Sequence, residues 1–199
     1  MPNAHWDERF SQKEYYYGTD PNEFFKTQLS LLKPGRLLLL GEGEGRNAVY
    51  AAQRGWRVDA VDESIEGKKK ALALAKSRNT TLSYTVQSLE TFNPKENMYD
   101  AVGLIFIHMP EILKKKIHAQ SIAVLKPGGR IILEAFDKEQ ITKTSGGPRD
   151  SALLYSTDII AQDFHSLQTI LLEQKTVELS EGKHHRGEAI VVRFVGEKK

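Results

Sequence analysis

The chain of 199 residues contains no cysteine. A disulfide scaffold, a thiolate zinc site and a cysteine nucleophile are therefore excluded. Net charge is also nearly absent, because 28 Lys and Arg residues oppose 26 Asp and Glu residues. A balance so close to neutral gives no overall electrostatic attraction to nucleic acid or to a membrane surface, so neither is expected as a partner.

Long hydrophobic runs are missing too. The longest, Leu37–Leu40 and Ile131–Leu133, are far too short to span a bilayer. The N-terminal segment is polar and aromatic, without the apolar stretch of a signal peptide. The composition, 40% hydrophobic and 27% charged, is typical of a globular protein. We expect a single domain over residues 1–199 and a cytoplasmic location, and the sequence leaves a monomer and a homodimer equally open.

The chain alternates short apolar runs with charged, helix-like stretches. The expected strands are Arg36–Leu40, Arg57–Val61, Thr81–Val86, Ala101–Ile107 and Arg130–Ala135, and the expected helices are Asn47–Arg54, Ser64–Arg78 and Glu111–Val124. Two later runs, Thr176–Leu179 and Ala189–Val195, leave no room for a crossover helix and must pair as an antiparallel hairpin. The sequence therefore predicts a doubly wound α/β fold, with a mostly parallel seven-stranded sheet and one antiparallel strand from the C-terminal hairpin.

A glycine-rich turn, with glycines at 41, 43 and 45, follows the first expected strand. Glycines let the backbone turn tightly and let a ligand approach it closely. A dinucleotide-binding loop would need its third glycine at position 46, where the chain has Arg46. A Walker phosphate loop is also absent, because no Gly-Lys-Ser/Thr follows. Taken alone, the pattern fits an ordinary turn equally well.

An acid at the end of the second strand adds to this pattern. Asp62 stands 17 residues after Gly45. Folds of this kind hold a ribose by its hydroxyl groups with an acid at this place. The alternative is that Asp62 caps the following helix, although Ser64 can take that role instead.

The segment Leu37–Ala48 resembles the first motif of class I S-adenosylmethionine-dependent methyltransferases. Val58–Asp62, Tyr99–Val102, Leu125–Gly129 and the hairpin agree with that family in order and spacing, so that the resemblance covers about residues 35–199. It implies a Rossmann-like fold and S-adenosyl-L-methionine as cofactor. The cofactor-binding residues that it implies are Gly41, Glu42, Gly43, Gly45, Arg46, Asp62, Glu63, Ser88, Leu89, Ile105 and Phe106.

Within this class, the chain is similar to the tellurite-resistance-like and thiopurine-like small-molecule methyltransferases. The segments that carry the similarity are Trp6–Phe10, Tyr17–Asn22, Phe106–Pro110 and Glu181-Gly182-x-x-His185-x-Gly187. The similarity implies methyl transfer by in-line displacement to a small-molecule acceptor, either a thiol or a chalcogen oxyanion.

Three positions depart from the family pattern. Leu39 stands where the family often has an acid, Glu42 where it usually has a small residue or Cys, and Ser88 where an acid often contacts the adenine. Glu42 can supply the missing carboxylate to the positively charged cofactor. The departures leave one alternative open, a catalytically degenerate protein that binds the cofactor or regulates a partner.

A second alternative is an RNA methyltransferase, which the lysine runs Lys68–Lys70 and Lys114–Lys116 suggest. Such an enzyme would need the two runs to join on one face, with aromatic residues between them. We expect solvated helix faces instead.

Two histidines are candidates for catalysis, although a base is needed only when the nucleophile carries a proton. His108 follows the fourth strand, where it can equally be bound to the backbone. His185 lies in the expected hairpin connection, which is usually solvated. Tyr17, Arg149 and His185 are the candidate contacts of the acceptor.

The N-terminal segment 1–34 is expected to be helical and aromatic, and it either folds over the cofactor to exclude water or packs against the sheet. No metal site is expected, because His184 and His185 lack companions at ligand spacing.

Overall fold

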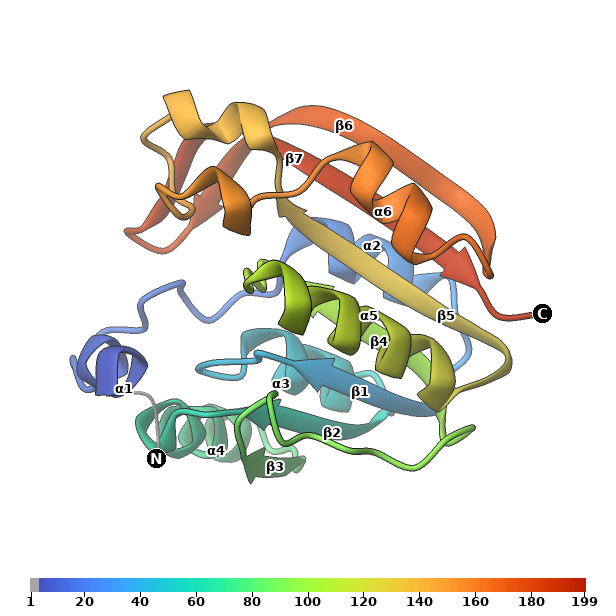
Figure 1. Ribbon diagram of the computed structural model, residues 1–199. Helices are drawn as coiled ribbons and strands as arrows, with labels where there is room; N and C mark the ends of the chain where they lie inside the picture. Colours follow the sequence, from blue (N-terminus) through green and yellow to red (C-terminus); the bar gives the residue numbers. More distant parts are fainter. Residues whose placement is uncertain (1–3) are drawn as a thin grey trace.

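The computed structural model describes residues 4–199, which form one mixed seven-stranded sheet between two layers of helices (Figure 1). The strand order is β3-β2-β1-β4-β5-β7-β6, and β7 runs antiparallel to the other six strands. The strands are β1 (Arg36–Leu40), β2 (Arg57–Asp62), β3 (Ser83–Val86), β4 (Tyr99–Ile105), β5 (Leu125–Phe136), β6 (Gln168–Glu181) and β7 (His185–Glu197). The predicted doubly wound α/β fold with a C-terminal hairpin is confirmed.

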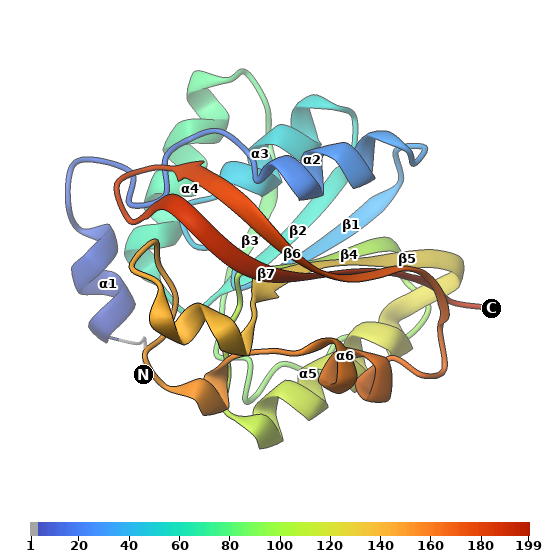
Figure 2. The same ribbon diagram turned by 90° about the horizontal axis from the view of Figure 1, so that it is seen from above.

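Helices cover both faces of the sheet. They are α1 (Ala4–Phe10), α2 (Glu23–Ser30), α3 (Arg46–Gln53), α4 (Ile65–Ser77), α5 (Glu111–Val124) and α6 (Thr157–Asp163), with short 3-10 turns η1 (Lys138–Thr142) and η2 (Ser151–Leu153). Figure 2 shows α2, α3 and α4 on one face of the sheet and α5 and α6 on the other. No helix within residues 4–199 is long and apolar enough to cross a membrane.

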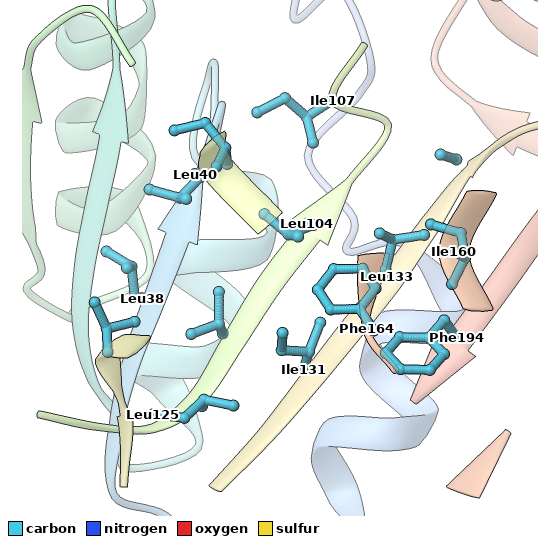
Figure 3. Packing of buried hydrophobic residues seen from close by; sticks show 14 of the residues in the cluster. Leu38, Leu40, Leu104, Ile107, Leu125, Ile131, Leu133, Ile160, Phe164 and Phe194 are labelled. Atoms are coloured by element: carbon cyan, nitrogen blue, oxygen red, sulfur yellow. The ribbon is translucent and has the colours of Figure 1, made fainter. Parts of the chain in front are cut away.

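The central strands read as unbroken apolar runs because helices bury both of their faces. Consecutive side chains of a strand point to opposite faces. Leu38 and Leu40 therefore pack toward α5 and α6 (Figure 3), whereas Leu37 and Leu39 pack toward α2 and α3. Full burial of such a side chain contributes about 1.5–3 kcal/mol.

Strand β4 ends two residues earlier than the sequence predicts. Phe106 has a φ of 51°, in the left-handed region, and this turn takes the chain out of the sheet. Its N–H still donates to the carbonyl of Glu134 on β5 at 2.7 Å. The apolar run continues to the buried Ile107, beyond the end of the strand, and hydrophobicity alone does not mark where a buried strand stops.

The hairpin is much longer than predicted, and its connection is much shorter. Strands β6 and β7 have 14 and 13 residues, joined only by Gly182, Lys183 and His184. The prediction of a connection from Ser180 to Gly187 is therefore wrong, since both of those residues belong to paired strands. Strand β6 lies at the edge of the sheet, so many of its side chains are exposed and polar, and the apolar pattern does not reveal its length.

The predicted turn Lys126–Gly129 lies inside the span of β5. Its residues leave the ladder, because Tyr99 pairs with Leu125 whereas Ala101 pairs with Arg130. The turn is thus a local interruption at the start of a strand that continues to Phe136.

Candidate active site

A cavity of about 370 Å³ lies where the carboxyl ends of β1, β2 and β4 meet the loops that follow them. Its size is within the range of small-molecule sites. Ten of the eleven expected cofactor residues line it: Gly41, Glu42, Gly43, Arg46, Asp62, Glu63, Ser88, Leu89, Ile105 and Phe106. Tyr17, His108 and His185 line it as well.

Gly45, the remaining expected cofactor residue, lies outside the cavity wall. A Cβ atom there would come within 2.5 Å of the Ala71 Cβ on α4, and its φ is +88°. At Gly43 a Cβ would come within 3.2 Å of the Phe10 ring. Gly43 therefore keeps the loop close to α1, whereas Gly45 allows α3 to pack against α4.

Asp62 holds the glycine loop in place. One carboxylate oxygen accepts the N–H of Gly43 at 2.9 Å, and the other accepts the N–H of Ser64 at 2.8 Å. Ser64 itself caps α4, because its Oγ accepts the N–H of Gly67 at 2.9 Å. Burial raises the pKa of Asp62 to about 6, although these hydrogen bonds favour its charged form. The cap is thus supplied by Ser64, and Asp62 lines the cavity.

Glu42 is directed to the first turn of α3. Its Oε1 accepts the N–H of Ala48 at 2.7 Å. Burial raises the pKa of Glu42 to about 7, although the N–H of Ala48 and the charge of Arg46 favour ionisation. The departure at Leu39 lies on β1, is buried in the same cluster as Phe25 of α2, and does not line the cavity. Glu42 and Leu39 therefore have structural roles, whereas the third departure, Ser88, lines the cavity.

Replacing Glu42 with glutamine is expected to stabilise the fold at pH 8 more than at pH 5. The pKa of Glu42 is raised from 4.5 to about 7 in the folded protein. Ionisation of Glu42 therefore lowers the free energy of unfolding as the pH rises through this range, by up to about 3 kcal/mol. Glutamine cannot ionise, so the cost disappears. Thermal unfolding at both pH values measures the difference, with the exposed Glu178→Gln as the control. An equal shift in melting temperature at both pH values would contradict the prediction.

The sequence predicts His185 at a solvated hairpin tip, and this is wrong. The residue lies in β7, with only 5% of its surface exposed. It pairs across the hairpin with Glu181, so that both side chains lie on the same side of the ribbon. Its Nδ1 donates to Glu181 Oε2 at 3.3 Å. Aromatic rings surround it, with centroids at 4.4 Å for Tyr17 and 4.7 Å for Phe106.

Glu181 connects several elements next to His185. Besides His185, it accepts Arg46 Nη2 at 2.8 Å, and its other oxygen accepts Asn22 Nδ2 at 2.9 Å. Burial alone would raise the pKa of Glu181, but the hydrogen bond from His185 and the charge of Arg46 outweigh it and lower the pKa to about 2. The second guanidinium nitrogen of Arg46, Nη1, is buried without a partner among the described residues.

His108 is bound to the backbone, and it also lines the cavity. Its Nδ1 donates to the carbonyl of Leu153 at 3.1 Å. Burial lowers the pKa of His108 to about 4, against the opposing effect of this hydrogen bond. Its Nε2 is buried and has no hydrogen-bond partner in residues 4–199.

Helix α1 lies beyond the carboxyl ends of the parallel strands, at the left of Figure 1. Trp6 and Phe10 line the cavity from it. Asp7 accepts Ser64 Oγ at 2.6 Å and the N–H of Glu66 at 3.1 Å. The aromatic N-terminal residues thus form one wall of the cavity.

The two lysine runs lie on opposite faces of the sheet, in α4 and α5 (Figure 2). They cannot form one surface. Lys114 is not solvated as expected, because it is 3% exposed and donates to the carbonyl of Leu154 at 3.1 Å.

Arg149 does not reach the cavity. It is exposed, and its guanidinium donates to the carbonyl of Lys143 at 2.7 Å. No group of three or more His, Asp or Glu side chains in the described part of the chain is arranged to hold a metal ion.

The sequence did not single out Asn22 or Glu181 as individual site residues. Glu181 belongs to the motif Glu181-Gly182-x-x-His185-x-Gly187. Its pairing with His185, four residues later, can be predicted only when the hairpin turn is known to have three residues. Asn22 approaches from α2 and has no local signal. Neither residue lines the cavity itself, whereas Asn47, Met109 and Leu113 line it without having been predicted.

Comparison with known proteins agrees with this arrangement. A family model described as a methyltransferase domain matches residues 37–129, which span β1 to the start of β5 and include the glycine loop and Asp62. None of the curated protein sequences matches this chain.

Solved structures share the fold at low sequence identity. TehB from Haemophilus influenzae superposes with a TM-score of 0.77 at 18% identity, over 98% of this chain and 67% of that chain. The N-methyltransferase NodS from Bradyrhizobium japonicum, in complex with S-adenosyl-L-homocysteine, gives 0.71 at 14% identity, over 98% and 97% of the two chains. A S-adenosylmethionine-dependent methyltransferase from Methanosarcina mazei gives 0.72 at 14% identity, over 90% and 98%.

Proposed function

We propose that the chain is a class I S-adenosylmethionine-dependent methyltransferase, and that it methylates a small-molecule acceptor, a thiol or a chalcogen oxyanion, by in-line displacement. The observation that carries this proposal is one cavity lined by the glycine loop, Asp62, His108 and the buried His185. We assign the cofactor to the end at Asp62 and the acceptor to the end at the two histidines.

The residues at the Asp62 end fit S-adenosylmethionine. The Asp62 carboxylate stands at the end of β2, where such folds bind the ribose hydroxyls. The unpartnered Arg46 Nη1 is a cationic donor suited to the amino-acid carboxylate of the cofactor. Ser88 and Leu89 line the side on which the adenine would lie. When bound, the cofactor supplies a methyl group on a sulfonium.

The protein contributes mainly by bringing the two reactants together in line, which can lower the barrier by roughly 7–11 kcal/mol. We propose that Trp6 and Phe10 close the cavity over the cofactor and exclude water, as part of a single domain over residues 1–199. Tyr17 and His185 contact the acceptor, and Arg149 is not needed there because it binds the backbone elsewhere.

The tellurite-resistance-like and thiopurine-like branch is supported by the sequence motifs and by the similarity in fold to TehB. A small molecule is favoured over RNA because the lysine runs lie on opposite faces. A cytoplasmic location agrees with a chain that lacks cysteine.

Calorimetric titration with S-adenosylhomocysteine tests the cofactor site, and release of that product from S-adenosylmethionine tests turnover with a panel of thiols and chalcogen oxyanions. We expect saturable heat and turnover with at least one acceptor class. No heat and no thermal shift at millimolar cofactor would contradict the proposal. Binding without turnover of any acceptor would instead support a degenerate protein.

A further inference from the structure

Glu42 has one carboxylate oxygen that the fold does not use. Its Oε1 accepts the N–H of Ala48 at 2.7 Å, whereas Oε2 has no hydrogen bond within residues 4–199. Oε2 is also not among the unpartnered side-chain atoms that the protein shields completely from solvent. The residue is 9% exposed, and it lines the cavity together with Gly41 and Gly43. Oε2 is therefore the oxygen that a molecule in the cavity can reach.

The neighbouring acids are placed differently. Asp62 uses both of its oxygens to hold backbone N–H groups, and Glu63 follows it along the same cavity. Glu44 belongs to the glycine loop but does not line the cavity. Its carboxylate accepts Lys70 Nζ at 2.7 Å and the N–H of Tyr16 at 2.7 Å. Of the two glutamates in the loop, only Glu42 thus adds its charge to the cavity.

The groups that face Glu42 come from three elements. Arg46 of α3 favours the ionised form of Glu42, and Asp62 of β2 opposes it. The phenol of Tyr84, on β3, stays neutral because burial and these acids raise its pKa. The guanidinium of Arg46 is shared, since its Nη2 binds Glu181 and we assign its Nη1 to the carboxylate of the cofactor. No cation among the described residues is paired with Glu42 alone.

S-adenosylmethionine and S-adenosylhomocysteine differ in charge at one atom, because the first has a sulfonium and the second a neutral thioether. Their ribose, adenine and amino-acid groups are the same. A carboxylate with an open oxygen in a partly dry cavity attracts a cation far more strongly than a neutral group. We infer that Glu42 makes the cavity prefer the sulfonium cofactor over its neutral product. This inference rests on the proposed function and concerns only how the cofactor end distinguishes the two.

Proton release accompanies this preference. Burial raises the pKa of Glu42 to about 7, so that about half of these carboxyl groups are protonated at pH 7. A cation next to the carboxylate lowers its pKa and expels the proton, whereas a neutral thioether does not. At pH 8 Glu42 is already ionised, but at pH 6 it must first lose its proton, which weakens sulfonium binding by about tenfold. Any contribution from Asp62 is common to both ligands, because both carry the ribose.

The first test needs only the unaltered protein. Both ligands are titrated calorimetrically at pH 7 in phosphate and in Tris, whose different ionisation enthalpies reveal the number of protons released. We expect S-adenosylmethionine to release about half a proton and S-adenosylhomocysteine less. The ratio of their two Kd values should also change by about tenfold between pH 6 and pH 8.

The outcomes separate this inference from the proposed function. Equal proton release by the two ligands, with a Kd ratio that does not change with pH, would overturn the role of Glu42 and leave the proposed function intact. Failure of both ligands to bind would overturn both.

The second test compares Glu42→Gln with Glu44→Gln. Glutamine keeps an oxygen for the N–H of Ala48 but has no charge. At pH 8, Glu42→Gln is expected to raise the Kd of S-adenosylmethionine by about tenfold or more and that of S-adenosylhomocysteine by less than about threefold. The difference in proton release should disappear as well. Glu44→Gln should keep the Kd ratio, because Glu44 is paired with Lys70 outside the cavity. An unchanged Kd ratio in Glu42→Gln would overturn the inference.

Discussion

Replacing Asp62 with alanine is expected to weaken S-adenosylhomocysteine binding by about 100-fold or more. In the proposed site the carboxylate accepts two hydrogen bonds from the ribose, each of about 1.5–3 kcal/mol for a charged partner, and tenfold in Kd corresponds to about 1.4 kcal/mol. The same substitution leaves the N–H groups of Gly43 and Ser64 unpaired, so the loop loses its anchor. Calorimetric titration measures the affinity.

Asp59→Ala is the matched control for this prediction. Asp59 lies on the same strand, but it pairs with Arg36 at 2.7 Å and does not line the cavity. The affinity of the Asp59→Ala variant for S-adenosylhomocysteine should match that of the unaltered protein. If Asp62→Ala proves unfolded, Asp62→Asn keeps one carbonyl oxygen for the loop and still lacks the charge. Unchanged affinity in a folded Asp62 variant would show that the ribose binds elsewhere.

Replacing Gly45 with alanine is expected to destabilise the protein by about 2–5 kcal/mol. A left-handed backbone costs a residue with a side chain about 1–2 kcal/mol, and overpacking adds about 1–3 kcal/mol. Both penalties apply here, because φ is +88° and the new Cβ would approach the Ala71 Cβ at 2.5 Å. Urea-induced unfolding gives the free energy directly.

Gly128→Ala separates the two penalties. Gly128 has a similar φ of +78°, but no atom lies within 4 Å of a Cβ added there. It should therefore lose only the backbone contribution, about 1–2 kcal/mol. If both variants lost the same free energy of unfolding, the packing of Gly45 against Ala71 of α4 would accommodate the added Cβ without a penalty, which would contradict the prediction.

Much of the fold could be predicted because local patterns and tertiary structure agree. Strand β1 is apolar from Leu37 to Leu40, and α5 was predicted from Glu111 to Val124 as observed. The length of β6 could not be predicted, because an edge strand with one solvated side has no continuous apolar pattern. The end of β4 was missed because the turn at Phe106 is as hydrophobic as the strand before it.

The two ends of the site differ in how far the sequence predicts them. The cofactor end is built from consecutive loop residues and from Asp62, so motif spacing identifies it. The acceptor end depends on a hairpin register and on Asn22, which is far away in sequence. The wrong prediction for His185 followed from placing the hairpin turn over too many residues. A residue in the turn would be exposed to solvent, whereas His185 belongs to a paired strand, which fixes its position.

The contacts of the hairpin and those of the glycine loop form at different stages of folding. The hydrogen bonds of Glu181 to Arg46 and to Asn22 join residues 135 and 159 positions apart in the chain, whereas Asp62 reaches Gly43 across only 19. Contacts between distant residues close large loops and form late in folding. Partial unfolding that releases β6 and β7 thus displaces Glu181 and His185, whereas Asp62, the proposed ribose ligand, keeps its bond to Gly43. On gradual denaturation, the protein should lose turnover before it loses its affinity for S-adenosylhomocysteine.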